Sequence, residues 1–266
     1  IAGGGLAGSL IALALAARRP DLSVLLVESG ETIGGTHIWP FLESDVPPEH
    51  RWLIEPLIGH SWPGYFVLFP KLRRRVRTPC HALLSERLGE AVRAALPPER
   101  ILTGRRALSV GRTGLTLEDG TRIEAKAVID ARGPSTLSLL DLGWRKSLAQ
   151  VVRTEAPHGL DRPVLIDATV RQHDGYRFAG VLPLGADRLR IEDVYYSDGA
   201  AMDRGLLARR IEEYAAARGW TIAAVESEEA SALPVVQGGD FERYWQSGGN
   251  GVAKAGIRAG LVHPLT

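Results

Sequence analysis

Three features of the 266-residue sequence predict a mixed α/β fold. A glycine-rich loop between Gly3 and Gly8 precedes an apolar stretch with the length of a helix, and a buried strand follows that stretch. The order of glycine loop, helix and strand begins a parallel sheet of the Rossmann type. After residue 144 the pattern changes to a run of β segments. We therefore predict a Rossmann-like nucleotide-binding domain with an inserted antiparallel β-sheet domain.

The first half of the chain contains the helices and strands expected of the nucleotide-binding domain. A helix over residues 6–18 ends before Pro20, which cannot continue it, and an apolar strand over 22–27 follows. Apolar residues at helical spacing between Leu84 and Leu96 predict a helix over 81–96. The turn Asp119-Gly120 predicts a hairpin. The remaining predictions are a helix near 49–58 and strands at 65–69, 72–77, 114–117 and 121–129.

The second half is interpreted as a sheet with one long helix. The predicted strands are 149–154, 164–170, 176–182, 188–195, 221–225 and 230–236, and the helix covers about 203–218. We assign five segments to two domains. Residues 1–64, 80–143 and 251–266 form the nucleotide-binding domain, whereas 65–79 contribute strands to a substrate domain that otherwise comprises 144–250.

The composition excludes several classes of protein. With 45% hydrophobic and 24% charged residues, the chain is neither disordered nor a coiled coil. Its net charge of +1 argues against broad nucleic-acid binding. The single cysteine, Cys80, excludes an intrachain disulfide and a thiolate zinc site, and it fits a reducing compartment. The seven histidines show no metal-ligand spacing, so we expect no metal.

Gly3, Gly5 and Gly8 form the motif G-x-G-x-x-G, and Glu28 follows twenty residues later at the end of a strand. The first glycine allows the tight turn, the second lets a pyrophosphate approach the backbone, and the third allows close packing of helix on strand. Glu28 can accept hydrogen bonds from ribose hydroxyls. The alternative is an ordinary glycine-rich turn. The motif itself does not distinguish NAD from FAD.

Two later segments favour FAD. Gly34 and Gly35 resemble the continuation of the fingerprint in FAD-binding proteins of the glutathione-reductase and hydroxylase type. The strand 128–133, with Asp130 and Gly133, resembles the second flavin-contacting motif of those proteins. Alternatively, Asp130 is a turn or cap residue, because Asp and Gly favour turns.

Linear segments throughout the chain resemble one family in particular. They include Gly34-Gly35-Thr36-His37-Ile38-Trp39, Trp62-Pro63-Gly64-Tyr65, Gly175-Tyr176-Arg177-Phe178, Ile191-Glu192-Asp193 and the segment from Arg258 to Pro264. In this order and over nearly the whole chain, they are similar to segments of the bacterial-type lycopene β-cyclases. On this resemblance Gly260 and Pro264 are expected near the cofactor, and we add Arg87 as a residue that could reach a phosphate of FAD from its helix. The alternative for Arg87 is a solvent-facing helical arginine.

The resemblance implies an isomerase, or intramolecular lyase, that closes the ends of lycopene or a related acyclic carotenoid into β-ionone rings. The products would be γ-carotene and β-carotene, and the family uses reduced FAD, with NAD(P)H as the electron source, without net redox change. The chemistry needs a desolvated acid, a dry apolar tunnel and a negative or π-rich group near the transient cation. Two alternatives remain: a flavin monooxygenase or other oxidoreductase of the same fold, and a lipid-binding protein without activity.

The family's acidic pair corresponds to Glu192 and Asp193, with Glu192 in the acid/base position. Strand alternation places Asp193 with Leu189 and Ile191 on one face and Glu192 with Arg190 on the other. If the apolar face lines the tunnel, Asp193 is favoured; if it packs under the domain, Glu192 is. A solvent-facing pair of Glu192 with Arg190 is the alternative without function. Burial would tune the pKa of the acid.

Further expectations concern His37 and the run from Lys71 to Arg77. His37 and Trp39 either lie near flavin or polyene or pack in an ordinary loop. The run contains five basic residues in seven, which fits either contact with anionic lipid or protection of a sheet edge. No apolar run reaches the roughly 20 residues of a membrane span. We therefore expect a cytoplasmic protein that associates peripherally with a membrane surface.

Only Ile1 and Ala2 precede Gly3, whereas a strand usually needs about five residues. The resemblance also implies a sizeable part after Thr266. We therefore expect an interior portion of a longer protein that by itself binds FAD poorly and is inactive.

Overall fold

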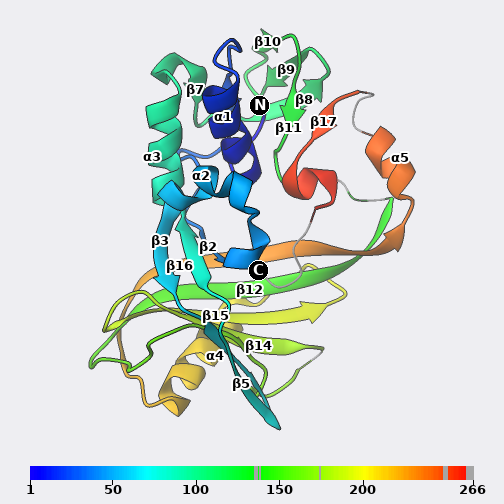
Figure 1. Cartoon of the computed structure of the whole chain (residues 1–266). Coiled ribbons are helices and arrows are strands. Elements are labelled where there is room, and N and C mark those ends of the chain that lie inside the picture. Colours follow the sequence, from blue (N-terminus) through cyan, green and yellow to red (C-terminus); the bar gives the residue numbers. More distant parts are fainter. Residues whose placement is uncertain (135–136, 138, 174, 248–250, 262–266) are drawn as a thin grey trace.

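The computed structural model describes residues 1–134, 137, 139–173, 175–247 and 251–261. Figure 1 shows two regions stacked on one another. The upper region holds the glycine loop, helices and small sheets, and we call it the glycine-loop region. The lower region is one large sheet with a helix beneath it.

A short parallel sheet forms the centre of the glycine-loop region. β1 (Leu26–Val27) pairs with β7 (Ile101–Leu102), and β11 (Ile129–Asp130) pairs with β17 (Ala253–Lys254), each pair parallel. Ala2 bridges Val27 on one side and Asp130 on the other. The predicted parallel sheet is therefore confirmed. The strand expected over 22–27 shortens to two residues, because its partner β7 spans only two residues and Leu22 lies at the surface, 43% exposed.

Helix α1 (Leu6–Arg18) matches the prediction and packs against α3 (Ser85–Ala95). The helix predicted over 81–96 is wrong in its first turn. Residues Cys80–Leu84 form strand β6, which pairs on one side with β2 (Ile38–Leu42) and on the other with β3 (Ile58–Trp62). Pairing along both edges outweighs the helical spacing of the apolar residues.

The helix expected near 49–58 is mostly replaced by tighter turns. Only α2 (Arg51–Ile54) is α-helical, between the 3₁₀ turns Pro48–His50 and Glu55–Leu57. Pro56 in the second turn prevents α2 from continuing. A further 3₁₀ turn, Glu43–Asp45, follows β2, and another, Pro98–Arg100, precedes β7.

The hairpin predicted at Asp119-Gly120 is confirmed. Gly120 has φ +85°, and the Thr121 amide donates to Asp119 Oδ1 at 2.9 Å. The hairpin joins β9 (Gly114–Leu117) to β10 (Arg122–Glu124), and β8 (Ala107–Gly111) completes an antiparallel sheet of three strands. The strand expected to reach residue 129 ends at Glu124, since Ile129 belongs to the parallel sheet.

The large sheet has seven strands in the order β16-β12-β15-β14-β13-β4-β5. Three of its strands are longer than predicted: β15 has 10 residues, β12 has 15 and β16 has 18, so the two strands expected near 221–236 are one. Continuous antiparallel pairing of β12 with β16 and β15 explains this length. The strands are β4 (Tyr65–Phe69), β5 (Leu72–Val76), β12 (Leu140–Thr154), β13 (Val164–Asp167), β14 (Arg177–Pro183), β15 (Arg188–Ser197) and β16 (Ile222–Gly239).

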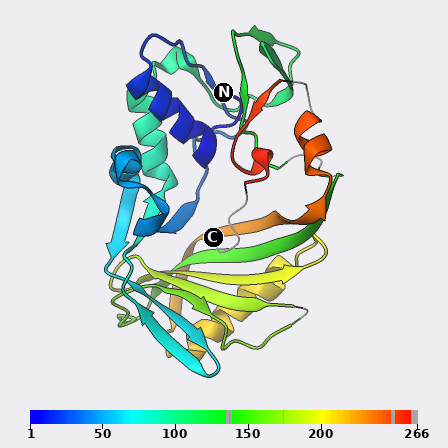
Figure 2. The ribbon, with the colours of Figure 1, turned by 45° about the vertical axis from the view of Figure 1, so that its right-hand side comes forward.

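Helix α4 (Arg204–Ala217) covers one face of this sheet, which we call the α4 face. Its first turn is capped by Asp203, whose Oδ1 accepts from the Leu206 amide at 2.9 Å. The core beneath α4 contains buried residues from the sheet and the helix: Leu148, Val152, Val164, Ala179, Val181, Leu189, Ile191, Leu207, Ile211, Tyr214 and Ala215. The opposite face, called the inner face, is turned toward the glycine-loop region (Figure 2).

Helix α5 (Phe241–Gln246) and the 3₁₀ turn Gly256–Ala259 were not predicted. Tyr244, 1% exposed, connects them, because its hydroxyl donates to the Arg258 carbonyl at 2.6 Å. The two segments close the glycine-loop region beside β17 (Figure 1).

Candidate active site

The glycine loop has the geometry that its motif requires. Gly3 has φ +103°, and a Cβ there would lie 2.3 Å from the Ala131 carbonyl oxygen. A Cβ at Gly8 would lie 1.9 Å from the carbonyl oxygen of Gly3, so only glycine allows helix and loop to pack this closely. A Cβ at Gly5 would meet no atom within 4 Å. The second glycine therefore faces open space, as a backbone that approaches a pyrophosphate must.

Glu28 lies beside this loop. Its two carboxylate oxygens accept from the amides of Gly4 at 2.6 Å and Gly30 at 2.7 Å. Gly34 continues the same cluster, since its amide donates to the Gly4 carbonyl at 2.9 Å, and Gly34 and Gly35 have φ +78° and +66°. The structure thus brings five predicted positions together: Gly3, Gly5, Glu28, Gly34 and Gly35. This arrangement, with an α1 N-terminus that no side chain caps, fits the ADP part of FAD.

Asp130 lies behind the loop and is 4% exposed. Burial acts to raise its pKa, but hydrogen bonds from Arg132 and the charges of Arg132 and Arg258 hold the pKa below its usual range. The distances are 2.9 Å from Arg132 Nε and 3.3 Å from Arg258 Nε, both to Oδ1. Asp130 therefore joins β11 to the Gly256–Ala259 turn. Gly133, with φ +77°, has no atom within 4 Å of a Cβ position.

The other predicted cofactor residues are more dispersed. Arg87 donates from Nη1 to the Ile58 carbonyl at 2.6 Å, which anchors α3 to the start of β3. Gly260 has φ +76° and ends the Gly256–Ala259 turn, where a Cβ would lie 2.8 Å from the Phe241 ring. Pro264 lies outside the described residues.

Glu192 is on the inner face, as expected when the apolar face packs under the sheet domain. Leu189 and Ile191, its neighbours in the alternation, are buried beneath α4. The Glu192 carboxylate accepts from Arg145 Nη2 at 3.1 Å and from Arg190 Nη1 at 2.8 Å. Its side chain is 12% exposed. The expected alternative, a solvent-facing pair of Glu192 with Arg190, is therefore wrong about the exposure of Glu192, although Arg190 is indeed its partner.

The charge state of Glu192 is set by these two arginines. Burial alone acts to raise its pKa, but the charges of Arg190 and Arg145, with hydrogen bonds from Arg190 and Ser147, lower the pKa to about 2. Glu192 is therefore an ionised carboxylate over the whole physiological range. The arrangement suits a group that accepts a proton or balances a positive charge.

Asp193 points to the opposite face, which confirms that the adjacent carboxylates do not share a site. Its side chain is 2% exposed and accepts from Arg177 Nε at 2.9 Å, and Arg210 of α4 lies 3.9 Å away. Burial raises the pKa of Asp193 despite these arginines. Its contacts tie β15 to β14 and α4.

Small residues flank Glu192 on the inner face. Ala149 of β12 and Gly180 of β14 are its direct cross-strand partners. One strand further, Glu229 of β16 pairs with Ala149, so the row reads Glu229, Ala149, Glu192, Gly180. A patch of aromatic rings lies farther along the same face, with Tyr176 5.7 Å from Phe178 and 6.1 Å from Tyr196 between ring centroids.

His37 reaches this row from the glycine-loop region. Its Nδ1 contacts Glu229 Oε1, and its ring lies 5.3 Å from that of Trp39. The sequence did not indicate Glu229. Its strand contains several glutamates, and no local pattern shows which of them contacts a histidine 192 residues away.

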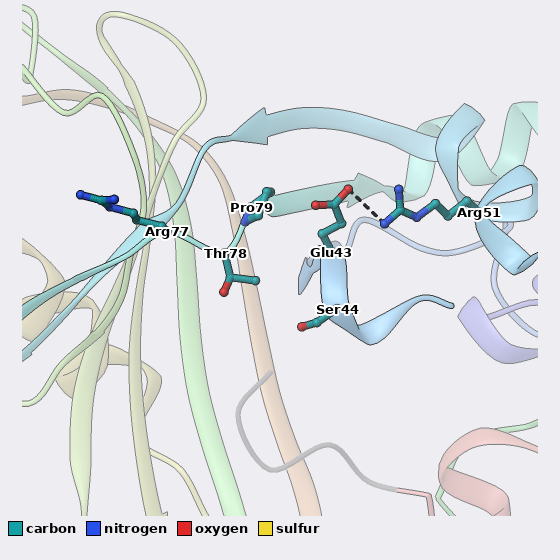
Figure 3. Close-up of a pocket in the computed structure, with 6 residues that line it drawn as sticks. All are labelled: Glu43, Ser44, Arg51, Arg77, Thr78 and Pro79. Carbon is teal, nitrogen blue, oxygen red and sulfur yellow. Dashed lines mark ion pairs between the residues drawn. The ribbon is translucent and has the colours of Figure 1, made fainter. Parts of the chain in front are cut away.

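A polar pocket of about 470 Å³ lies elsewhere, where the chain passes from β5 to β6 (Figure 3). It is lined by Glu43, Ser44, Arg51, Arg77, Thr78 and Pro79, and Arg51 pairs with Glu43 at 3.1 Å. None of the predicted site residues lines it, so the acid on the inner face and this pocket are separate features. Within the described residues no cluster of His, Cys, Asp and Glu could hold a metal ion. In the same part of the chain, no helix is long and apolar enough to cross a membrane.

The whole sequence matches one family profile, described as "Lycopene cyclase protein", over residues 1–266. The chain belongs to the lycopene cyclase family. A lycopene beta-cyclase of Pseudescherichia vulneris is 43% identical over 267 residues, covering 100% of this chain and 68% of that protein. One of Pantoea ananas is 39% identical over 267 residues, covering 100% of this chain and 69% of that protein.

Solved structures show the fold that this member of the lycopene cyclase family shares. A geranylgeranyl bacteriochlorophyll reductase-like protein from Thermoplasma acidophilum superposes with a TM-score of 0.64 at 14% identity, covering 100% of this chain and 72% of its own. A flavin-dependent halogenase from Xanthomonas campestris gives a TM-score of 0.64 at 17% identity, with coverages of 99% and 66%. The chain therefore has the Rossmann-like FAD-binding fold with a large antiparallel-rich sheet, as predicted.

Proposed function

We propose that the protein is a lycopene β-cyclase, an isomerase that closes the linear ends of lycopene into β-ionone rings, giving γ-carotene and β-carotene. Membership of the lycopene cyclase family supports the reaction, and so do two relatives of that name at 43% and 39% identity over the whole chain. The solved neighbours are less than 20% identical and indicate the fold alone. They give no specific support to a monooxygenase or another oxidoreductase.

FAD is the cofactor that the glycine-loop region fits best. Gly3, Gly5 and Gly8 would hold its pyrophosphate against α1, and Glu28 would accept from the ribose hydroxyls. Reduced FAD, with NAD(P)H as the electron source, would supply negative charge near a transient cation. The remaining chemistry belongs to side chains on the inner face of the sheet.

The observation that carries the proposal is the ionised carboxylate of Glu192 between Ala149 and Gly180. Ring closure starts when a proton adds to the terminal double bond of the polyene. The neighbouring double bond then attacks the resulting cation and forms the ring C–C bond. The ring cation finally loses a proton from an adjacent carbon, and we assign to Glu192 the role of accepting it. Asp193 holds the sheet and helix together in this scheme.

Peripheral contact with a membrane from the cytoplasmic side completes the proposal, because the substrate is an apolar polyene. β5 is the edge strand of the large sheet, and its residues Leu72, Arg73, Arg74 and Arg75 are exposed. Phe69 and Leu72 at the hairpin tip are 37% and 53% exposed. A basic strand with an apolar tip fits an anionic bilayer surface.

The test of the reaction is the full-length protein expressed in a host that accumulates lycopene, with pigments separated by chromatography. We expect the wild type to form cyclic carotenoids and Glu192→Gln to lose at least about 100-fold of the rate while retaining flavin. Glu226→Gln is the matched control, since Glu226 also pairs with two arginines, Arg153 at 2.7 Å and Arg188 at 2.6 Å, but at the edge of the sheet. Unchanged β-carotene formation by Glu192→Gln would reject the assignment of Glu192.

A further inference from the structure

The pair His37–Glu229 connects the two regions of the molecule on the inner face. His37 follows the Gly34-Gly35 turn, which is hydrogen-bonded to the glycine loop through the Gly34 amide. Glu229 lies in the cross-strand row of Glu192, with Ala149 between the two acids. Two steps between neighbouring strands separate the backbones of Glu229 and Glu192 by roughly 10 Å. Glu229 and Glu192 therefore lie on one face of the sheet, on either side of Ala149, which is 4% exposed.

The reaction needs a proton donor that Glu192 does not provide. At neutral pH its carboxylate is ionised, because Arg145 and Arg190 both contact it. Asp193 and its arginines face α4, on the other side of the sheet. Among the described residues of the inner-face row, His37 with Glu229 is the remaining pair that can carry a proton.

We propose that the His37–Glu229 pair delivers the proton that starts ring closure and that Glu192 takes up the proton released at the end. This inference rests on the proposed cyclase function. Nδ1 of His37 is bound to Glu229, so the proton leaves from Nε2 and forms a new C–H bond with the electrons of the terminal double bond. One proton enters and one leaves, and solvent exchange returns His37 and Glu192 to their starting states. No electron is transferred.

The charges around His37 support a protonated imidazole. The hydrogen bond and charge of Glu229 on β16 raise the pKa of His37, whereas partial burial and Arg190 on β15 act to lower it, and the net direction is upward. Arg190 is itself balanced by Glu192. On β12, between these strands, the residue paired with Glu229 is the uncharged Ala149. The fourth neighbour, Trp39 on β2, is also uncharged.

In a purely structural role, the His37–Glu229 pair would only hold the two regions together. The two roles differ in what Glu229→Gln does. The amide oxygen of glutamine still accepts a hydrogen bond from His37 Nδ1, so the structural contact between the two regions would persist. Its missing charge, however, would lower the pKa of His37. A proton donor would then lose its proton at lower pH than in the wild type.

The experiment uses full-length, FAD-loaded protein with lycopene in liposomes, and the cyclisation rate is measured between about pH 5 and pH 9. We expect His37→Gln to retain FAD and lose at least about 100-fold of the rate. For Glu229→Gln we expect the alkaline fall of the pH profile to move to lower pH. His81→Gln is the matched control, because His81 Nδ1 also has a hydrogen-bond partner, Ser61 Oγ at 2.9 Å, on the neighbouring sheet.

Three outcomes are distinguished. A His37→Gln rate within about threefold of the wild type overturns the inference, as does an alkaline limb of Glu229→Gln that coincides with that of the wild type. If His37→Gln loses FAD or folds poorly, the Glu229→Gln profile decides alone. Absence of cyclisation by the wild type, in contrast, would reject the proposed function itself.

Discussion

Glu192 is the residue whose chemistry depends most on distant parts of the chain. Its position follows from the family motif, and its partner Arg190 is two residues away. Arg145, the second partner, is 47 residues away in sequence. Only antiparallel pairing of β12 with β15 brings Arg145 onto the same face, so the sequence could not predict a carboxylate held by two arginines. Arg190 and Arg145 together lower the pKa of Glu192 to about 2, so the expected tuned acid is an anion at neutral pH.

The first prediction at this scale concerns stability and pH. Glu192→Gln leaves Arg145 and Arg190 buried together without a counter-charge, which we expect to cost about 3–5 kcal/mol at neutral pH. The pKa of Glu192 falls from 4.5 to about 2 on folding. Its charge therefore contributes stability that is fully present above pH 4.5 and lost as the pH falls toward 2.

Urea unfolding of wild type and Glu192→Gln at a series of pH values measures this contribution. The difference in free energy of unfolding should be constant near neutral pH and shrink as the solution is acidified. An equal difference at about pH 3 and pH 7 would show that packing, and not charge, causes the loss.

The other residues of the site also divide into those that the local sequence predicts and those that depend on distant segments. The glycines and Glu28 could be predicted because local spacing alone defines the turn, the helix start and the strand end. The contact of His37 with Glu229 could not, because it joins two regions 192 residues apart. The hydrogen bond of Arg87 with the Ile58 carbonyl likewise joins distant segments, and a cofactor role for Arg87 stays a prediction.

At the scale of elements, helix α1, the hairpin turn at Gly120 and strands β9, β14 and β15 followed from the sequence to within two residues, whereas β6, β12 and β16 did not. Helix α1 begins after the glycine loop and ends before Pro20, and both signals are local. Strand β6 occupies the positions where the helix was expected to begin, because β2 and β3 satisfy its backbone on both sides. β16 likewise continues for 18 residues where the sequence indicated two strands, since β12 pairs along its length.

The hairpin of β4 and β5 carries the positive charge from which we predict a contact with anionic lipid. Figure 2 shows it projecting from the end of the large sheet away from the glycine-loop region. We expect replacement of Arg73, Arg74 and Arg75 by glutamine to weaken binding to anionic liposomes by roughly 100-fold, at about 1 kcal/mol for each charge. Co-sedimentation at low and high salt measures this binding.

Arg106→Gln with Arg122→Gln is the matched control, because both arginines are exposed on the other region, at 65% and 76% of the side chain. Equal binding of the wild type to neutral and anionic lipid would exclude an electrostatic contact. The charges would then serve only to protect the sheet edge from pairing with another chain.

At the scale of the whole molecule, a shared apolar cluster joins the two regions. Trp62, Cys80 and Ala82 of the three-stranded sheet β2-β6-β3 pack against Val151 and Leu182 of the large sheet and against Leu184, which follows β14. Trp62 is 8% exposed and is the largest of these residues. The sequence indicated each strand's apolar residues, but the meeting of two sheets is a property of the complete fold.

Removal of Trp62 should therefore uncouple the two regions. We expect Trp62→Ala to lower stability by about 3–5 kcal/mol and to split a single calorimetric unfolding transition into two. Trp245→Ala is the control, since Trp245 is 41% exposed and lies outside this cluster. One undivided transition in Trp62→Ala would show that other contacts suffice to couple the regions.

The burial of Cys80 in this cluster has a consequence for oxidative damage. The chain has one cysteine and one methionine. Cys80 is 0% exposed, and burial raises the pKa of its thiol to about 12, while Met202 packs against the core beneath α4. Reduced flavins react with dioxygen, and the peroxide that results attacks thiolates and exposed thioethers. In the proposed cyclase, with its reduced flavin, residues 1–266 would thus offer peroxide almost no reactive sulfur.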